Sequence, residues 1–119
     1  MKKEISVKES FDYFITTLDR YDCSHLKLKD NELLHIILSE LDIEAVSFLH
    51  HNTVDNLVKC NLIPSNVTSS IDELRNKTLF LLQYKRDVND IRNDSEWNYV
   101  RHLADEIKNK ILNSKKAEI

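Results

Sequence analysis

Glycine is absent from the 119 residues of this chain, and Pro64 is the single proline. Average usage would place about eight glycines in a chain of this length. Glycine most readily adopts left-handed turns and lets a backbone approach a ligand closely. Its absence excludes glycine-rich phosphate-binding loops and disfavours the two-residue hairpins of antiparallel sheets. We therefore expect a helical protein whose turns are made by Asn, Asp and Ser.

Long apolar runs and a strong net charge are also missing. The longest apolar runs, 36–38 and 79–82, are far shorter than the roughly 20 residues of a membrane-spanning helix. No apolar segment follows the N-terminal lysines, so no signal peptide is predicted. The formal net charge of -3 disfavours a nucleic-acid binder, which usually carries a basic face. We expect a cytoplasmic protein that binds neither membrane nor nucleic acid.

Residues that ligate metals are few and poorly spaced. The five histidines contain neither a pair four residues apart nor the HExxH pattern of zinc enzymes. Cys23 and Cys60 are expected to be free thiols in a reducing compartment. The sequence therefore predicts no metal and no organic cofactor.

Apolar residues recur at helical spacing in every long segment. Ser6 and Glu9 form a capping-box pattern at the first helix, Asp42 and Thr53 resemble helix N-caps, and Pro64 marks a break. The residues 22–25 and 87–94 are expected to be connecting segments. Helices are expected over 7–21, 30–40, 42–50, 53–60, 66–85 and 95–112. This pattern predicts an all-α bundle of five or six helices in a single domain spanning 1–119, with frayed ends at 1–5 and 113–119.

The apolar stripes of these helices define a predicted core. In the third helix, Ile43, Val46 and Leu49 are expected to line one side, with Ala45 and Phe48 beside them. The full predicted core consists of Phe11, Phe14, Leu18, Leu34, Ile37, Leu41, Leu49, Leu74, Leu81, Trp97, Val100, Ala104 and Ile107.

Two groups of acidic residues are the candidate partner-binding residues. The first contains Asp87, Asp90, Asp94 and Glu96, followed by Tyr99, which lies off the apolar stripe of its helix. One interpretation is that Asp87 and Asp94 are helix caps and that the others are merely solvated. The other is a docking edge for a basic partner, because carboxylates steer basic proteins and tyrosine is enriched at binding hot spots.

The second group contains Asp12, Asp19 and Asp22. Asp12 and Asp19 are seven residues apart and therefore share a face of the first helix. The sequence does not decide which of the two acidic groups meets a partner, or whether both are solvated.

Four motifs in the second half of the chain carry a family resemblance. They are LIP at 62–64, DELRN at 72–76, RNDSEW at 92–97 and VRHLADEI at 100–107. With these motifs, residues 60–112 resemble helical immunity proteins of contact-dependent growth inhibition and related polymorphic toxin systems. The motifs are structural rather than catalytic, so no functional residues are carried over. The resemblance implies a cytosolic protein that binds one cognate toxin domain, often a nuclease, and blocks its active site.

Two other classes of protein remain open. A homodimeric helical regulator, such as the antitoxin of a toxin–antitoxin pair, would use the Leu/Ile-rich helix 30–40 as its dimer seam. A degenerate nuclease of the HEPN class would need an Arg and a His a few residues apart. Arg92 and His102 are too far apart for that pattern, and Arg101 and His102 are adjacent, which puts them on different helix faces. We therefore do not predict an enzyme.

Overall fold

The computed structural model describes the backbone of residues 6–117 and the side chains of residues 6–113. The regular elements within this range are all helical, which confirms the predicted all-α fold. In chain order they are α1 (Val7–Asp19), η1 (Cys23–Lys27), α2 (Asp30–Leu34), η2 (His35–Leu41), α3 (Asp42–Phe48), α4 (His51–Lys59), η3 (Ser65–Val67), α5 (Thr68–Tyr84), α6 (Val88–Asn93) and α7 (Ser95–Ala117).

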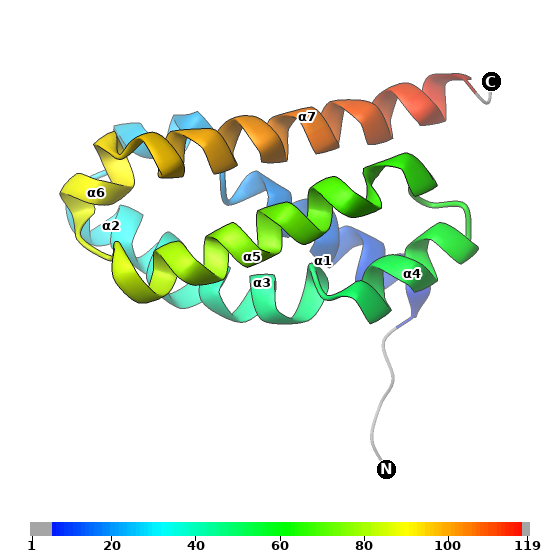
Figure 1. Ribbon diagram of the computed structural model, residues 1–119, viewed down its shortest axis with the longest axis horizontal. Coiled ribbons are helices and arrows are strands. Elements are labelled where there is room, and N and C mark those ends of the chain that lie inside the picture. Colours follow the sequence, from blue (N-terminus) through cyan, green and yellow to red (C-terminus); the bar gives the residue numbers. More distant parts are fainter. Residues whose placement is uncertain (1–5, 118–119) are drawn as a thin grey trace, which may run out of the picture.

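The helices form one globule around a shared core (Figure 1). The long helices α5 and α7 lie side by side, and α1 packs behind them against α3, α4 and α7. The short helix α6 joins the end of α5 to the start of α7 and also contacts α2. The segment expected to break the helical pattern at 87–94 is therefore itself mostly helical.

The N-terminus of α1 is built as the sequence predicts. The Glu9 amide donates to Ser6 Oγ at 3.1 Å, and the Ser6 amide donates to Glu9 Oε1 at 3.4 Å, which completes the capping box. The helix ends at Asp19 rather than at Tyr21, because Tyr21 turns into the core. Asp22 then accepts from the Ser24 amide at 2.8 Å and starts η1.

The prediction that Asp42 begins a new helix is wrong. Asp42 has helical dihedral angles, φ -56° and ψ -49°, whereas an N-cap is extended. The chain is helical without interruption from α2 through η2 to α3, and η2 is a π-helical segment of seven residues.

The π segment explains which residues of this long helix are buried. Buried residues recur at every fourth position, at Leu33, Ile37, Leu41, Ala45 and Leu49. On a regular α-helix such a stripe drifts by about 40° per step and would leave the core. The wider i→i+5 turns of η2 counteract that drift. Ile43 and Val46 are consequently 69% and 48% exposed, whereas Leu49 is buried, so the expectation that the three share one side of the helix is wrong.

The turns around α4 use polar residues in place of glycine. His50, not Thr53, caps α4: its Nδ1 accepts from the Asn52 amide at 3.2 Å. Asn61 follows α4 with a left-handed φ of 60°, and the Leu62 amide donates back to the Leu57 carbonyl. This is the position that glycine usually occupies after a helix.

The C-terminal helix is longer than expected. Residues 113–117 continue α7, so the helix extends beyond the predicted range 95–112. Each residue added to an existing helix contributes one hydrogen bond, and buried Ile111 secures the preceding turn. The frayed ends predicted at 1–5 and 118–119 lie outside the described residues.

Most of the predicted core is buried. Phe11 and Leu34 are only partly buried and pack against its edge. Trp97 is 1% exposed, and its indole Nε1 donates to the Lys85 carbonyl at 2.9 Å. The other predicted core residues, all buried, are Phe14, Leu18, Ile37, Leu41, Leu49, Leu74, Leu81, Val100, Ala104 and Ile107.

Candidate partner-binding surface

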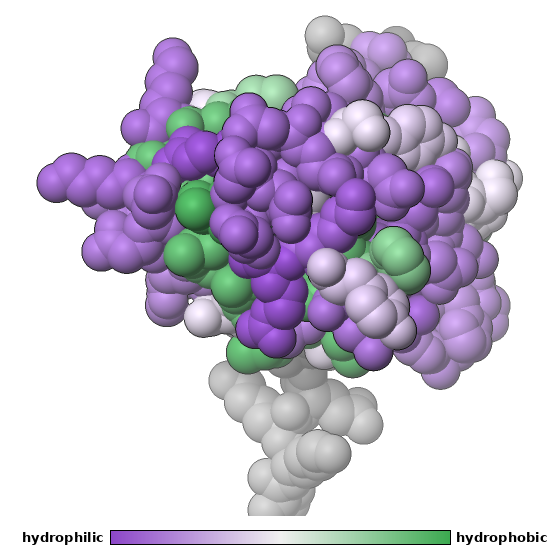
Figure 2. Space-filling view, turned by 60° about the vertical axis from the view of Figure 1, so that its left-hand side comes forward, coloured by the Kyte–Doolittle hydropathy of each residue, from purple (hydrophilic) through white to green (hydrophobic). Residues whose placement is uncertain are grey.

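Exposed aromatic side chains gather where α5 and α7 meet. Tyr84, Phe80 and Tyr99 are 64%, 50% and 45% exposed, and they are three of the four exposed aromatic residues among the described side chains. Figure 2, which brings the α2 and α6 side forward, shows a mostly hydrophilic surface on which apolar residues form limited patches. We define the α5–α7 surface by six residues: Glu73, Lys77, Phe80, Tyr84, Glu96 and Tyr99.

Contacts within this surface connect the two helices. On α5, the rings of Phe80 and Tyr84 lie one turn apart, with centroids 4.9 Å from each other. Across the seam, the Tyr99 hydroxyl donates to Glu73 Oε2 at 2.8 Å, which raises the pKa of Tyr99 because the bond favours the neutral phenol. Lys77 Nζ lies 5.2 Å from the centroid of the Tyr99 ring, within cation–π range.

The end of the α5–α7 surface beside Tyr84 is anchored by an ion pair. Lys85 Nζ lies 2.6 Å from Asp94 Oδ2, and the Asp94 side chain is only 14% exposed. The hydrogen bond from Lys85, followed by one from the Glu96 amide, lowers the pKa of Asp94, and the same pair raises the pKa of Lys85. Together with the bond from the Trp97 indole to the Lys85 carbonyl, this pair fixes the α6–α7 junction against α5.

Two members of the first acidic group are helix caps. Asp87 Oδ1 accepts from the Asn89 amide at 2.9 Å, and Asp94 Oδ1 accepts from the Glu96 amide at 2.8 Å. Both residues have extended dihedral angles at the start of a helix, as N-caps do. Their positions are therefore explained by the fold, independently of any partner.

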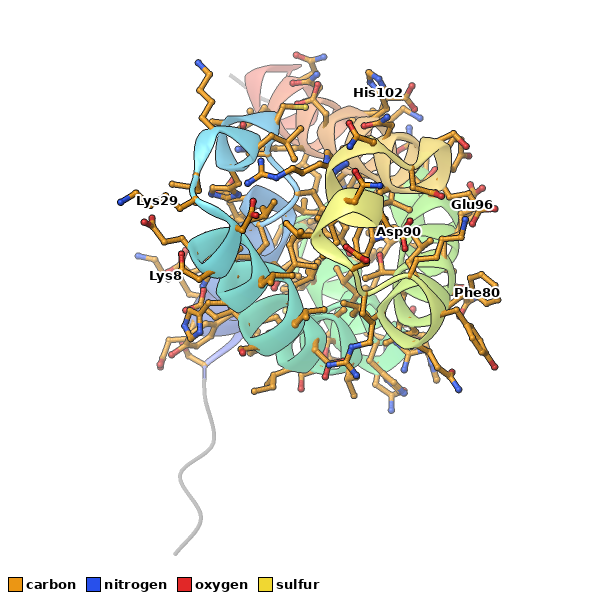
Figure 3. All side chains as sticks on the ribbon, turned by 90° about the vertical axis from the view of Figure 1, so that its left-hand side faces the viewer. Lys8, Lys29, Phe80, Asp90, Glu96 and His102 are labelled. Atoms are coloured by element: carbon orange, nitrogen blue, oxygen red, sulfur yellow. The ribbon has the colours of Figure 1, made fainter. Side chains whose placement is uncertain are left out.

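The remaining carboxylates of the first group lie near Lys85. Glu96 is exposed, and Asp90 is half-buried on α6. Both act electrostatically on Lys85, which places them near the end of α5. Figure 3 shows Phe80 and Glu96 projecting from the same side of the molecule, whereas Lys8 and Lys29 project from the opposite side.

The second acidic group lies on the other side of α7. Asp12 is exposed on α1, Asp19 forms an ion pair with Lys108 of α7, and Asp22 caps η1. The Ser24 amide lowers the pKa of Asp22 by this bond. Because Tyr99 reaches α5 and Lys108 reaches α1, the structure separates the two predicted acidic groups rather than combining them.

A groove of about 270 Å³ between α1, η1 and α7 contains two of these residues. Its polar groups are largely used within the protein: Asp19 pairs with Lys108, and Arg101 donates to the Ile91 carbonyl and to Asn98. Arg101 is 7% exposed, and burial lowers its pKa. The residues that line the groove are Leu18, Asp19, Tyr21, Asp22, Cys23, Arg101, His102, Ala104, Asp105 and Lys108.

The arginines considered for a nuclease have structural contacts. Arg92 donates to the Leu26 and Leu28 carbonyls and pairs with Asp30 at 2.8 Å, so it ties α6 to the segment before α2. Arg101 is buried next to exposed His102, as expected for adjacent residues on a helix.

In the part of the chain that the structure describes, no group of three or more His, Cys, Asp or Glu side chains is arranged to hold a metal ion. No described helix combines the length and the apolar character needed to cross a membrane. Cys23 and Cys60 are exposed free thiols.

Comparisons with protein-family models, curated proteins and solved structures find no match for this chain. The resemblance to immunity proteins therefore stays a prediction.

Sequence reasoning selected Tyr99 but missed Phe80 and Tyr84. Both lie off the buried α5 stripe that contains Ile71, Leu74 and Leu81. The argument applied to Tyr99, an aromatic residue outside the apolar stripe, identifies them as well, and their i, i+4 spacing makes them neighbours. Glu73 and Lys77 had no comparable signal, because their contacts with Tyr99 cross between two helices.

Proposed function

We propose that this protein is a cytoplasmic immunity protein. It binds a cognate toxin domain, of which a nuclease is the first candidate, and neutralises that domain by covering its active site. The observation that carries this proposal is the α5–α7 surface, where Phe80, Tyr84 and Tyr99 are exposed and exposed Glu96 projects from the same side of the molecule as Phe80 (Figure 3).

Such a surface has the two properties that a tight inhibitor needs. Aromatic side chains that become buried at the centre of an interface often dominate its binding energy. Carboxylates around them accelerate association with a basic partner and exclude wrong partners. A nuclease active site is positively charged because it binds phosphates, so an acidic, aromatic surface complements it. Neutralisation then requires steric coverage alone and no catalytic residue.

The proposal is tested by co-expression with a toxin domain. The experiment uses the C-terminal domain of a large secreted protein encoded directly upstream, followed by affinity purification of the complex and a growth assay. We expect co-purification and rescue of growth, and we expect Phe80→Ala/Tyr84→Ala to weaken both. The control is Tyr13→Ala, which removes an aromatic residue of similar exposure on α1.

Two results would contradict the proposed function: the absence of such a neighbouring domain, and failure of the two proteins to bind. Binding that the Phe80/Tyr84 variant leaves unchanged would contradict the assignment of the interface to the α5–α7 surface.

A homodimeric regulator or antitoxin is the second candidate, and the exposed side of α3 favours it. Ile43 and Val46 face the solvent there, and the nearby Tyr13 and Phe48 rings stack with centroids 5.0 Å apart. A dimer with this seam would give twice the monomer mass in light scattering, and Ile43→Glu would dissociate it. A small intracellular toxin encoded next to the gene would support this candidate. A degenerate nuclease, the third candidate, would cleave RNA or DNA in purified form.

A further inference from the structure

We infer that the α5–α7 surface recognises arginine side chains of a protein partner, with their guanidinium groups over the Phe80 and Tyr84 rings and paired with Glu96. This inference rests on the proposed function for the nature of the partner and adds the chemistry by which the partner is bound.

The aromatic rings of this surface already accept a cation from the protein itself. Lys77 Nζ lies 5.2 Å from the Tyr99 ring centroid, while the hydroxyl of that tyrosine is held by Glu73 at 2.8 Å. Tyr99 is therefore occupied on both its ring and its hydroxyl. The Phe80 and Tyr84 rings contact each other in a tilted arrangement, with their planes 47° apart, and remain 50% and 64% exposed, so their rings are available to a partner.

The charge around these rings also favours a cation. Five carboxylates, those of Glu73, Asp90, Asp94, Glu96 and Glu106, act electrostatically on Tyr99 or Lys85, and the ammonium groups of Lys77 and Lys85 lie among them. Asp94 is neutralised by Lys85. Glu96 is exposed, acts electrostatically on Lys85, and is not within ion-pair distance of any described cation. It projects from the same side of the molecule as Phe80 (Figure 3).

Arginine fits this combination better than lysine. Its planar guanidinium group stacks on an aromatic face and forms a two-point hydrogen bond with a carboxylate, whereas an ammonium group does neither as well. Guanidinium is also more weakly hydrated, so its transfer to an aromatic surface is less costly. A surface of rings beside a free carboxylate is thus selective for arginine, whereas an acidic group alone attracts any cation.

The test measures arginine selectivity without requiring the toxin. N-acetylated tetra-arginine, tetra-lysine and tetra-citrulline amides are titrated into 15N-labelled protein at physiological salt, and binding is followed by amide chemical shifts. We expect tetra-arginine to shift residues 80–85 and 95–99 and to bind more tightly than tetra-lysine. Tetra-citrulline, which has the same shape without charge, should not bind.

Two pairs of substitutions separate the aromatic contribution from simple charge attraction. Each ring is expected to contribute about 2- to 5-fold in affinity for arginine. Phe80→Leu/Tyr84→Leu keeps an apolar side chain at both positions but removes the rings, and should abolish the preference for arginine over lysine. Glu96→Gln should weaken both peptides. The matched controls, Tyr13→Ala and Asp12→Asn, should change neither affinity, and thermal unfolding verifies that each variant is folded.

Three outcomes would overturn the inference. They are equal affinity for the arginine and lysine peptides, shifts centred on α1 near Asp12, and an arginine preference that survives the Leu substitutions. If the peptides behave as expected but no toxin domain binds, the proposed function fails and the arginine surface stands. If a toxin domain binds through this surface without arginine selectivity, only the inference fails.

Discussion

The buried hydrogen bond between Tyr21, which follows α1, and Thr78 of α5 offers a quantitative test of how these two parts of the bundle are held together. The two hydroxyl oxygens are 2.6 Å apart, and the residues are 3% and 0% exposed. Burial raises the pKa of Tyr21 well above its ordinary value of 10, so the hydroxyl stays neutral at physiological pH. Both hydroxyl groups are therefore held in the core.

The expected costs of the single substitutions differ. Tyr21→Phe leaves the Thr78 hydroxyl, which has an alternative acceptor in a carbonyl of its own helix, so we expect a loss of about 1 kcal/mol. Thr78→Val leaves the Tyr21 hydroxyl buried with no such alternative, so we expect about 2–3 kcal/mol. Removing both hydroxyls leaves no unsatisfied group. The double variant should therefore lose only about 1–2 kcal/mol, a coupling of roughly 2 kcal/mol.

Urea unfolding followed by circular dichroism at 222 nm measures all four proteins of this cycle. Thr78→Ser is the control, because it keeps the hydroxyl and removes one buried methyl group. It should be less destabilising than Thr78→Val. If the loss of stability in the double variant equals the sum of the two single losses within about 0.5 kcal/mol, the hydrogen bond does not couple Tyr21 and Thr78.

Three further predictions concern the caps and faces of the helices. Asp94→Asn should lower the free energy of unfolding at pH 7. The difference in stability between the variant and the unchanged protein should shrink as the pH falls below about 4. The lowered pKa of Asp94 means that its carboxylate stabilises the fold only while it is charged. Chemical unfolding at several pH values measures this, and a difference independent of pH would contradict it. Leu49→Ala should cost about 2–5 kcal/mol, whereas Ile43→Ala should cost less than about 0.5 kcal/mol; a reversed order would show that the α3 face is misassigned. Asp87→Ala should cost about 0.5–2 kcal/mol through loss of the α6 cap, and Asp87→Asn, which retains an acceptor, should restore most of it in the same unfolding assay.

Helical periodicity predicted the fold because most stripes recur at three and four residues. It failed where the stripe from Leu33 to Leu49 has a strict period of four, since that spacing fits neither a straight α-helix nor a new helix beginning at Asp42. The π segment within this continuous helix is stabilised by tertiary packing, because it keeps five side chains in the core. Single-sequence patterns do not contain that information.

The candidate site was predictable only in part, because some of its residues are brought together by tertiary packing. The first acidic group and Tyr99 are close in sequence, so α6 and α7 keep them together. The aromatic half comes from α5 and joins them only through the packing of α5 against α7, visible in the bond between Tyr99 and Glu73. Local sequence reasoning therefore found the carboxylates and Tyr99 but not Phe80 and Tyr84.

The structure also changes how the acidic residues should be tested. Replacing the whole first group by Ala removes two helix caps and the Lys85–Asp94 pair at once, so lost binding would be inseparable from lost stability. In the second group, Asp22 caps η1 and Asp19 pairs with Lys108, so the same difficulty applies. Glu96 and Asp12 are exposed and are neither side-chain caps nor members of an ion pair within the described residues. Comparing Glu96→Gln with Asp12→Asn therefore asks which side of α7 meets the partner while leaving the fold unchanged.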